Sequence, residues 1–107
     1  MRSIRVSSFD GVDALTLEDI PPPVAGPGEV RIKVYVGGVN FPDLLMSEGK
    51  YQHKPEMPFT PGLEAAGVVI DAGEGVTRFK PGERVMGFFD YGAFAEEVVI
   101  QEKYLMH

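Results

Sequence analysis

The residues best able to do chemistry lie in one short segment, between a strongly alternating stretch and a helical one. Asn40 and Asp43 stand three residues apart at the expected start of a helix, and Tyr51 follows soon after its expected end. Backbone amides and polar side chains at such a junction can face a ligand. The same spacing suits a structural arrangement, because Asn is a favoured N-cap and an acidic first turn complements the helix dipole. Capping preferences favour the structural interpretation, but both stay open.

Glu64 is a further candidate, at the mouth of an otherwise apolar stretch that ends at Ala72. A carboxylate there needs a partner or water. It can act in catalysis, or it can anchor a neighbouring loop by accepting backbone hydrogen bonds. The Tyr51 hydroxyl can donate to a carbonyl, although a single loop Tyr is commonly a packing residue with a polar tip. Gly67, inside the apolar stretch, predicts a close backbone approach or a bulge.

The elements that position these residues are mostly short strands. Apolar and polar residues alternate strictly over residues 30–36, which is the period of a half-buried strand. Similar but weaker patterns predict strands over 4–6, 15–18, 65–72, 84–89 and 93–100. One helix of about two turns is expected from Phe41, with Gly49 closing it, and the proline-rich segment 21–28 is expected to be a stiff crossover. The chain is therefore expected to be mainly β, a barrel or sandwich with one small helix.

Composition narrows the function classes. The 107 residues suit one domain, and no apolar run approaches the length of a membrane span. The net charge of -6 argues against nucleic acid as a partner. The chain has no cysteine and only two histidines, so neither a disulfide nor a protein-only zinc site is expected. The first residues lack a signal peptide's apolar region, and cytoplasmic residence is the expectation.

Several motifs follow one another along the chain: Gly38-Val39-Asn40-Phe41-Pro42-Asp43-Leu44, Gly49-Lys50-Tyr51, the run from Pro58 to Val69, and Phe79-Lys80-Pro81-Gly82-Glu83-Arg84-Val85. In order and spacing they resemble those of the medium-chain dehydrogenase/reductase family over nearly the whole chain. The resemblance implies that residues 1–107 form the substrate-side, GroES-like domain, a partly open β-barrel with one short helix. The family's nucleotide-binding Rossmann domain would begin after His107. We therefore expect a truncated chain that is inactive alone and a full-length protein that is a homodimer.

A departure from the zinc alcohol dehydrogenases indicates the branch. Those enzymes carry Cys where this sequence has Asn40 and Gly-His-Glu where it has Gly62-Leu63-Glu64. The chain is thus similar to the zinc-independent quinone oxidoreductases, which implies NADPH-dependent hydride transfer to a quinone or another α,β-unsaturated carbonyl. Without a Lewis acid, the substrate must itself be an electrophile, and side-chain or water donors must stabilise the developing oxyanion.

The resemblance also implies roles for individual residues. Asn40 and Tyr51 would lie beside the nicotinamide and the substrate carbonyl, with Phe41 in contact with the cofactor, and Asp43 would order the loop. An apolar substrate slot would be lined by Phe41, Leu45 and Phe59, with Glu64 supporting it.

Two alternatives remain at this stage. A 2-enoyl-thioester reductase of the same family would also need a donor such as Tyr51 near its substrate. A non-catalytic GroES-like interaction module is the alternative from another class, because a fold does not fix a function.

Overall fold

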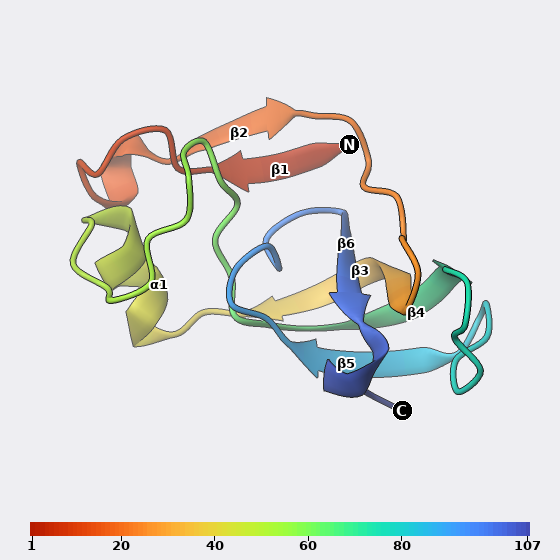
Figure 1. The fold of residues 1–107 in the computed structure, drawn as a ribbon. Helices are drawn as coiled ribbons and strands as arrows, with labels where there is room; N and C mark the ends of the chain where they lie inside the picture. Colours follow the sequence, from red (N-terminus) through yellow and green to blue (C-terminus); the bar gives the residue numbers. More distant parts are fainter.

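The most strongly alternating segment forms the longest strand of the structure, a computed structural model that describes residues 1–107 (Figure 1). This strand, β3 (Glu29–Gly38), belongs to a five-stranded antiparallel sheet with the order β6-β3-β4-β5-β7. The other strands of this sheet are β4 (Glu64–Ala72), β5 (Arg84–Phe88), β6 (Glu97–Gln101) and β7 (Leu105–Met106). A separate hairpin pairs β1 (Arg2–Arg5) with β2 (Thr16–Asp19). One helix, α1 (Phe41–Ser47), and two 3-10 turns, Val12–Ala14 and Glu102–Tyr104, complete the chain.

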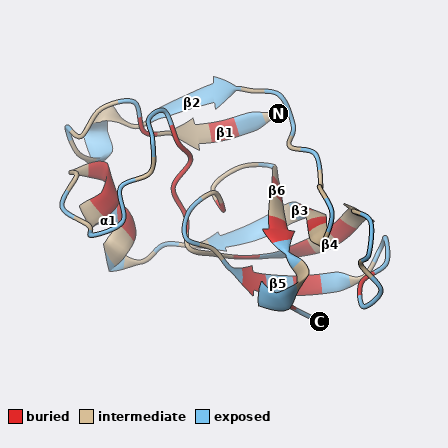
Figure 2. Cartoon of the chain, in the orientation of Figure 1, coloured by how far each residue is buried: buried red, intermediate tan, exposed pale blue.

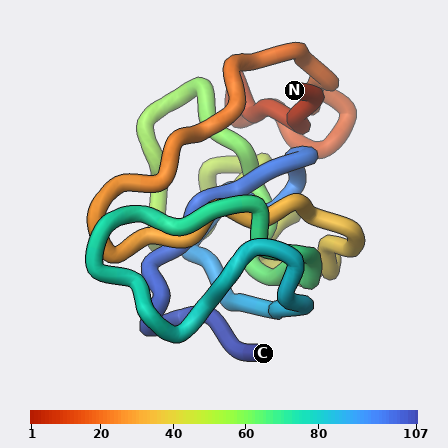
Figure 3. The backbone as a smooth tube through the Cα atoms, turned by 90° about the vertical axis from the view of Figure 1, so that its right-hand side faces the viewer, coloured from red at the N-terminus to blue at the C-terminus, as the bar shows by residue number.

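The five-stranded sheet curls on itself, and the molecule is elongated, with extents of 41 × 25 × 22 Å (Figures 1 and 3). In both views the β1–β2 hairpin lies at one end and the C-terminus at the other. The expected mainly β architecture, a partly open GroES-like barrel with one short helix, is confirmed. The proline-rich segment 21–28 contains no strand and connects the hairpin to β3.

Two clusters of buried side chains hold these elements together, and Figure 2 shows buried residues along the large sheet and on α1. The main core fills the inside of the curled sheet and is formed by Val30, Ile32, Val69, Phe79, Val85, Val98, Ile100 and Leu105. A smaller core joins the hairpin to α1 through Val6, Met46 and Phe59. Because alternate residues of a strand face opposite sides, Val30 and Ile32 are fully buried while Lys33 is exposed.

The sequence pattern misplaced several strand boundaries, most clearly those of β1 and β6, and it did not predict β7. The first strand ends at Arg5, and Val6 makes only an isolated bridge with Phe59. The strand expected over 93–100 begins at Glu97 instead. Its first residues bond to three different segments: Ala93 and Phe94 donate to carbonyls of the 61–62 loop, the Phe94 carbonyl accepts from Ile4, and the Glu96 carbonyl accepts from Val34 of β3. This stretch therefore ties the two sheets together rather than extending either one.

The predicted close approach at Gly67 is confirmed. A Cβ at this position would lie 1.9 Å from the backbone oxygen of Lys33 on the neighbouring strand. The pairing of β3 with β4 also slips there, so that Val34 faces Gly67 while Val36 faces Ala66. One extra residue is thus accommodated in β3, which is the form of a β-bulge. Beyond the bulge, Gly38 is the partner of Glu64.

Candidate functional site

The junction between β3 and α1 places Asn40 and Asp43 as a helix start. Asn40 has the extended backbone of an N-cap, and the Asp43 carboxylate accepts a hydrogen bond of 2.8 Å from the Asn40 backbone N–H. Asn40 and Asp43 have the reciprocal arrangement of a capping box, and the Asn40 amide nitrogen lies 3.5 Å from the Gly38 carbonyl. Asp43 therefore has a structural role in the loop, whereas the Asn40 amide keeps donor capacity for another partner.

Asp43 is the one charged residue that is buried in this chain. Its side chain is buried, and its second carboxylate oxygen has no hydrogen-bond partner of good geometry. Burial raises the pKa of Asp43, and the nearby charge of Glu64 adds to that effect, while the backbone amides of Asn40 and Gly62 act in the opposite direction. Two acidic groups thus converge where α1 begins and β4 starts.

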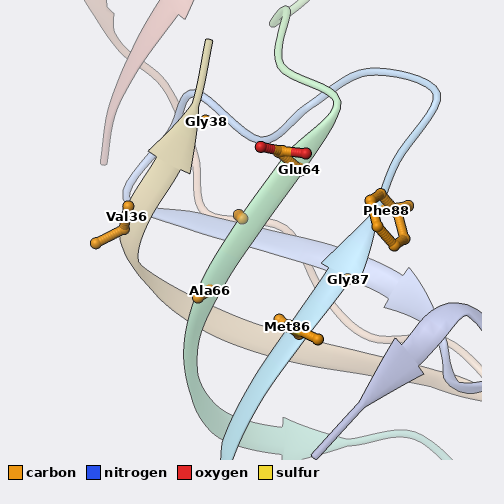
Figure 4. A pocket seen from close by; sticks show the side chains of 8 residues that line it. Val36, Gly38, Glu64, Ala66, Met86, Gly87 and Phe88 are labelled. Atoms are coloured by element: carbon orange, nitrogen blue, oxygen red, sulfur yellow. The ribbon is translucent and has the colours of Figure 1, made fainter. Parts of the chain in front are cut away.

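Glu64 lies across the sheet rather than against a loop (Figure 4). Its carboxylate is packed over Gly38, where a Cβ would be 2.0 Å from the nearer oxygen. Only glycine at position 38 leaves room for this side chain. The Glu64 carboxylate takes part in no ion pair and in no side-chain hydrogen bond, so the anchoring interpretation is not what the structure displays.

Glu64 is part of the wall of an apolar hollow on the face of β3, β4 and β5 (Figure 4). We call this the Glu64 hollow; it measures about 260 Å³, and its walls include Val36, Gly38, Glu64, Ala66, Met86 and Phe88. Glu64 is the only charged residue in that wall. An apolar surface with one polar group is typical of a site for a small organic ligand.

Tyr51 lines a second hollow of about 420 Å³, which we call the Tyr51 hollow. Its wall includes Tyr51, His53, Leu63, Phe88 and Asp90. Phe88, which is largely exposed, lines both hollows, so the two lie next to each other. The interpretation of Tyr51 as a packing residue also has support, because its ring packs partly against the smaller core.

The remaining predicted residues are spread around this region. Phe41 presents a ring that is 69% exposed on the first turn of α1, and Leu45 is half-buried on the same helix. Phe59 is only 3% exposed, because it packs between Val6 and Met46 in the smaller core. It touches neither the Glu64 nor the Tyr51 hollow and lines a cavity on another side. The expected slot of Phe41, Leu45 and Phe59 stays a prediction.

Sequence reasoning did not single out Gly38, Met86 or Phe88. Phe88 belongs to an aromatic run, residues 88–94, and aromatic clusters are commonly part of a core. Phe88 is instead largely exposed and lines both hollows. No three histidine, aspartate or glutamate side chains gather as a metal-binding group, and no helix is long and apolar enough to cross a membrane.

Comparison with known proteins gives the family. Residues 26–107 match the model of the alcohol dehydrogenase GroES-like domain, which is most of the chain. The chain belongs to this family. The resemblance to quinone oxidoreductases of the medium-chain dehydrogenase/reductase family is likewise confirmed by relatives and solved structures.

This GroES-like domain has relatives of considerable identity. Quinone oxidoreductase-like protein 2 of Rattus norvegicus is 44% identical over 91 residues, which is 85% of this chain and 26% of that protein. Quinone oxidoreductase of Lama guanicoe is 40% identical over 107 residues, covering 92% of this chain and 32% of that protein. The crystal structure of Escherichia coli quinone oxidoreductase complexed with NADPH aligns with a TM-score of 0.93 and 27% identity, covering 99% of this chain and 32% of that one. The GroES-like domain thus spans between about a quarter and a third of the length of these relatives.

Proposed function

We propose that this chain is the substrate-side domain of an NADPH-dependent quinone oxidoreductase that transfers hydride to a quinone or an enone. The observation that carries the proposal is the pair of adjacent hollows that have Glu64 and Tyr51 in their walls, with the Asn40 amide at the adjoining loop. The relatives named above support the reaction class, and one of their structures is an NADPH complex.

The residues present fit the nicotinamide end of the cofactor better than its phosphates. The exposed Phe41 ring offers a face for an aromatic group, and the Asn40 amide and Tyr51 hydroxyl offer donors. The chain has neither a glycine-rich phosphate loop nor an excess of positive charge. We propose that a Rossmann domain beyond this one holds most of the NADPH molecule.

When bound, NADPH supplies the hydride. In the proposed mechanism Asn40 and Tyr51 donate hydrogen bonds to the carbonyl oxygen that gains negative charge as the substrate is reduced. Asp43 holds the backbone of Asn40 and so positions its amide. The apolar walls formed by Val36 and Phe88 exclude water and favour a flat, poorly hydrated substrate.

We further propose that the reaction uses no zinc. Asn40 and Leu63 stand where zinc alcohol dehydrogenases have Cys and His, and neither an amide nor an aliphatic side chain is a usual zinc ligand. Elemental analysis of the purified protein tests this directly. Stoichiometric zinc that persists after dialysis would contradict it.

The experiment that tests the function follows NADPH oxidation with 1,4-naphthoquinone as acceptor, using the 107-residue chain and the longer protein that carries it. The chain alone is expected to be inactive. In the longer protein, Tyr51→Phe and Asn40→Asp each remove a donor, and Asp keeps the N-cap preference, so we expect about 100-fold slower turnover. Tyr35→Phe is the matched control, because Tyr35 is exposed on β3 and lines neither hollow.

Two results would count against the proposal. Turnover by the chain alone at the rate of the longer protein would refute the need for a second domain. Undiminished quinone reduction by both donor variants would remove Asn40 and Tyr51 from the mechanism. Faster reduction of an enoyl thioester than of the quinone would favour the enoyl reductase alternative.

A further inference from the structure

The Glu64 hollow combines an apolar surface with an uncompensated negative charge. Val36, Ala66, Met86 and Phe88 supply most of its wall, and Glu64 is its one charged group. No lysine or arginine forms an ion pair with Glu64. A carboxylate beside an apolar surface loses part of its hydration, and without a cationic partner nothing in the chain offsets that loss.

The backbone holds this charge in one place. The bulge in β3 makes Gly38 the cross-strand partner of Glu64, and the missing side chain at position 38 opens the space that the carboxylate occupies. On the other side Glu64 pairs with Phe88, so its charge lies between two adjacent strands that both border the hollow. Figure 4 shows the carboxylate above the sheet between Gly38 and Phe88.

The dimensions of the hollow fit a small ring system. A cavity of roughly 150 Å³ is enough to hold benzene. The Glu64 hollow, at about 260 Å³, therefore has room for a ring system larger than one benzene ring. A ligand seated there brings its substituents close to the Glu64 carboxylate.

We propose that Glu64 selects substrates by their charge. The hollow admits uncharged, flat electrophiles and rejects those that carry a sulfonate, carboxylate or phosphate close to the ring. This inference rests on the proposed function and deepens it. Two like charges about 5 Å apart near a protein surface repel each other strongly enough to weaken binding about tenfold or more. An uncharged quinone is not subject to this repulsion.

The test compares two probes that differ in charge, 1,4-naphthoquinone and 1,4-naphthoquinone-2-sulfonate. Each is titrated into the 15N-labelled chain, and amide shifts at Gly38, Ala66, Gly87 and Phe88 report binding in the Glu64 hollow. We expect the neutral quinone to bind at least tenfold more tightly than the sulfonate at low salt. Glu64→Gln is expected to reduce this preference about tenfold, because it keeps the shape of the side chain and removes its charge.

Two controls separate the charge from other effects. Glu74→Gln removes an equal charge from an exposed turn outside the hollow and is expected to leave the preference at the wild-type value. Glu64→Asp keeps the charge and is expected to retain most of the preference. Raising the salt concentration on the wild-type chain should also reduce the preference through screening, and this measurement does not depend on any variant folding.

The inference is overturned by equal affinity for the two probes, by a preference that Glu64→Gln leaves unchanged, or by shifts that map outside the hollow. Its failure is separable from that of the proposed function, because binding is measured without NADPH or turnover. If Glu64 sets a charge preference in binding but the longer protein reduces no quinone, only the proposed function is refuted. Turnover of both probes at equal rates by that longer form would sink the inference alone.

Discussion

Gly67→Ala tests whether the close approach of β3 and β4, the strands that carry Gly38 and Glu64, requires glycine at position 67. The added Cβ would lie 1.9 Å from the backbone oxygen of Lys33, where real contacts essentially never fall below 3.0 Å. The two central strands must therefore separate by about 1 Å, which is enough to break hydrogen bonds of normal length. Gly67 has no positive φ, so the cost is steric rather than conformational.

The magnitude follows from the hydrogen bonds lost. Two broken backbone bonds in a buried sheet, together with the groups left unpaired, cost about 2–4 kcal/mol of the roughly 5–15 kcal/mol by which a domain is stable. For a domain of this size that corresponds to a fall in Tm of roughly 10–25 °C. Urea titration and thermal melting followed by circular dichroism measure both quantities.

Gly75→Ala is the matched control. Gly75 has a φ of 86°, which an alanine adopts with strain, but nothing lies within 4 Å of the added Cβ. We expect a loss of about 1 kcal/mol from the backbone conformation alone. The reasoning is refuted if Gly67→Ala stays within about 1 kcal/mol of wild type, or if Gly75→Ala destabilises the chain as much.

Three further outcomes can be measured on the same chain. Burial raises the pKa of Asp43 above its ordinary value, so the unfolding free energy of the wild type falls as the pH rises through that raised pKa. The unfolding free energy of Asp43→Asn relative to the wild type should therefore increase from about pH 3 to pH 7. A difference that does not change with pH would contradict this. Ile32→Ala should cost about 2–5 kcal/mol, because the side chain is fully buried in the main core, whereas Leu17→Ala on exposed β2 should cost less than about 0.5 kcal/mol in the same urea titration. Gly38→Ala should displace the Glu64 carboxylate from the hollow and thereby lower the preference for neutral over sulfonated quinone, as seen in the same amide titration; an unchanged preference would show that Glu64 can stay in place.

Local patterns in the sequence were enough for much of the fold. The strict alternation from Val30 predicted the longest strand, and Asn40 with Pro42 predicted where the helix begins. Gly67 predicted a close backbone approach or a bulge, because glycine inside a strand commonly marks one of these. Each of these signals depends only on residues that are close together in the sequence, so their periodicity and backbone preferences can be recognised without the structure.

The sequence could not predict the segment from Ala93 to Glu96 in the same way. Its apolar character is that of a strand, but its hydrogen bonds go to the 61–62 loop and to the first strand of the hairpin. Phe59 is a second residue whose neighbours lie far away in the sequence, because it packs with Val6 and Met46 in the smaller core. Partners far apart in the chain decide both placements.

The sequence by itself determined the family, the kinds of element and the candidate residues Asn40, Tyr51 and Glu64. Only the tertiary structure decided that Glu64 packs over Gly38 without a partner and that Phe88 is the wall shared by two hollows. The reason is that cross-strand neighbours follow from the register of long-range pairing, and a one-residue bulge changes that register.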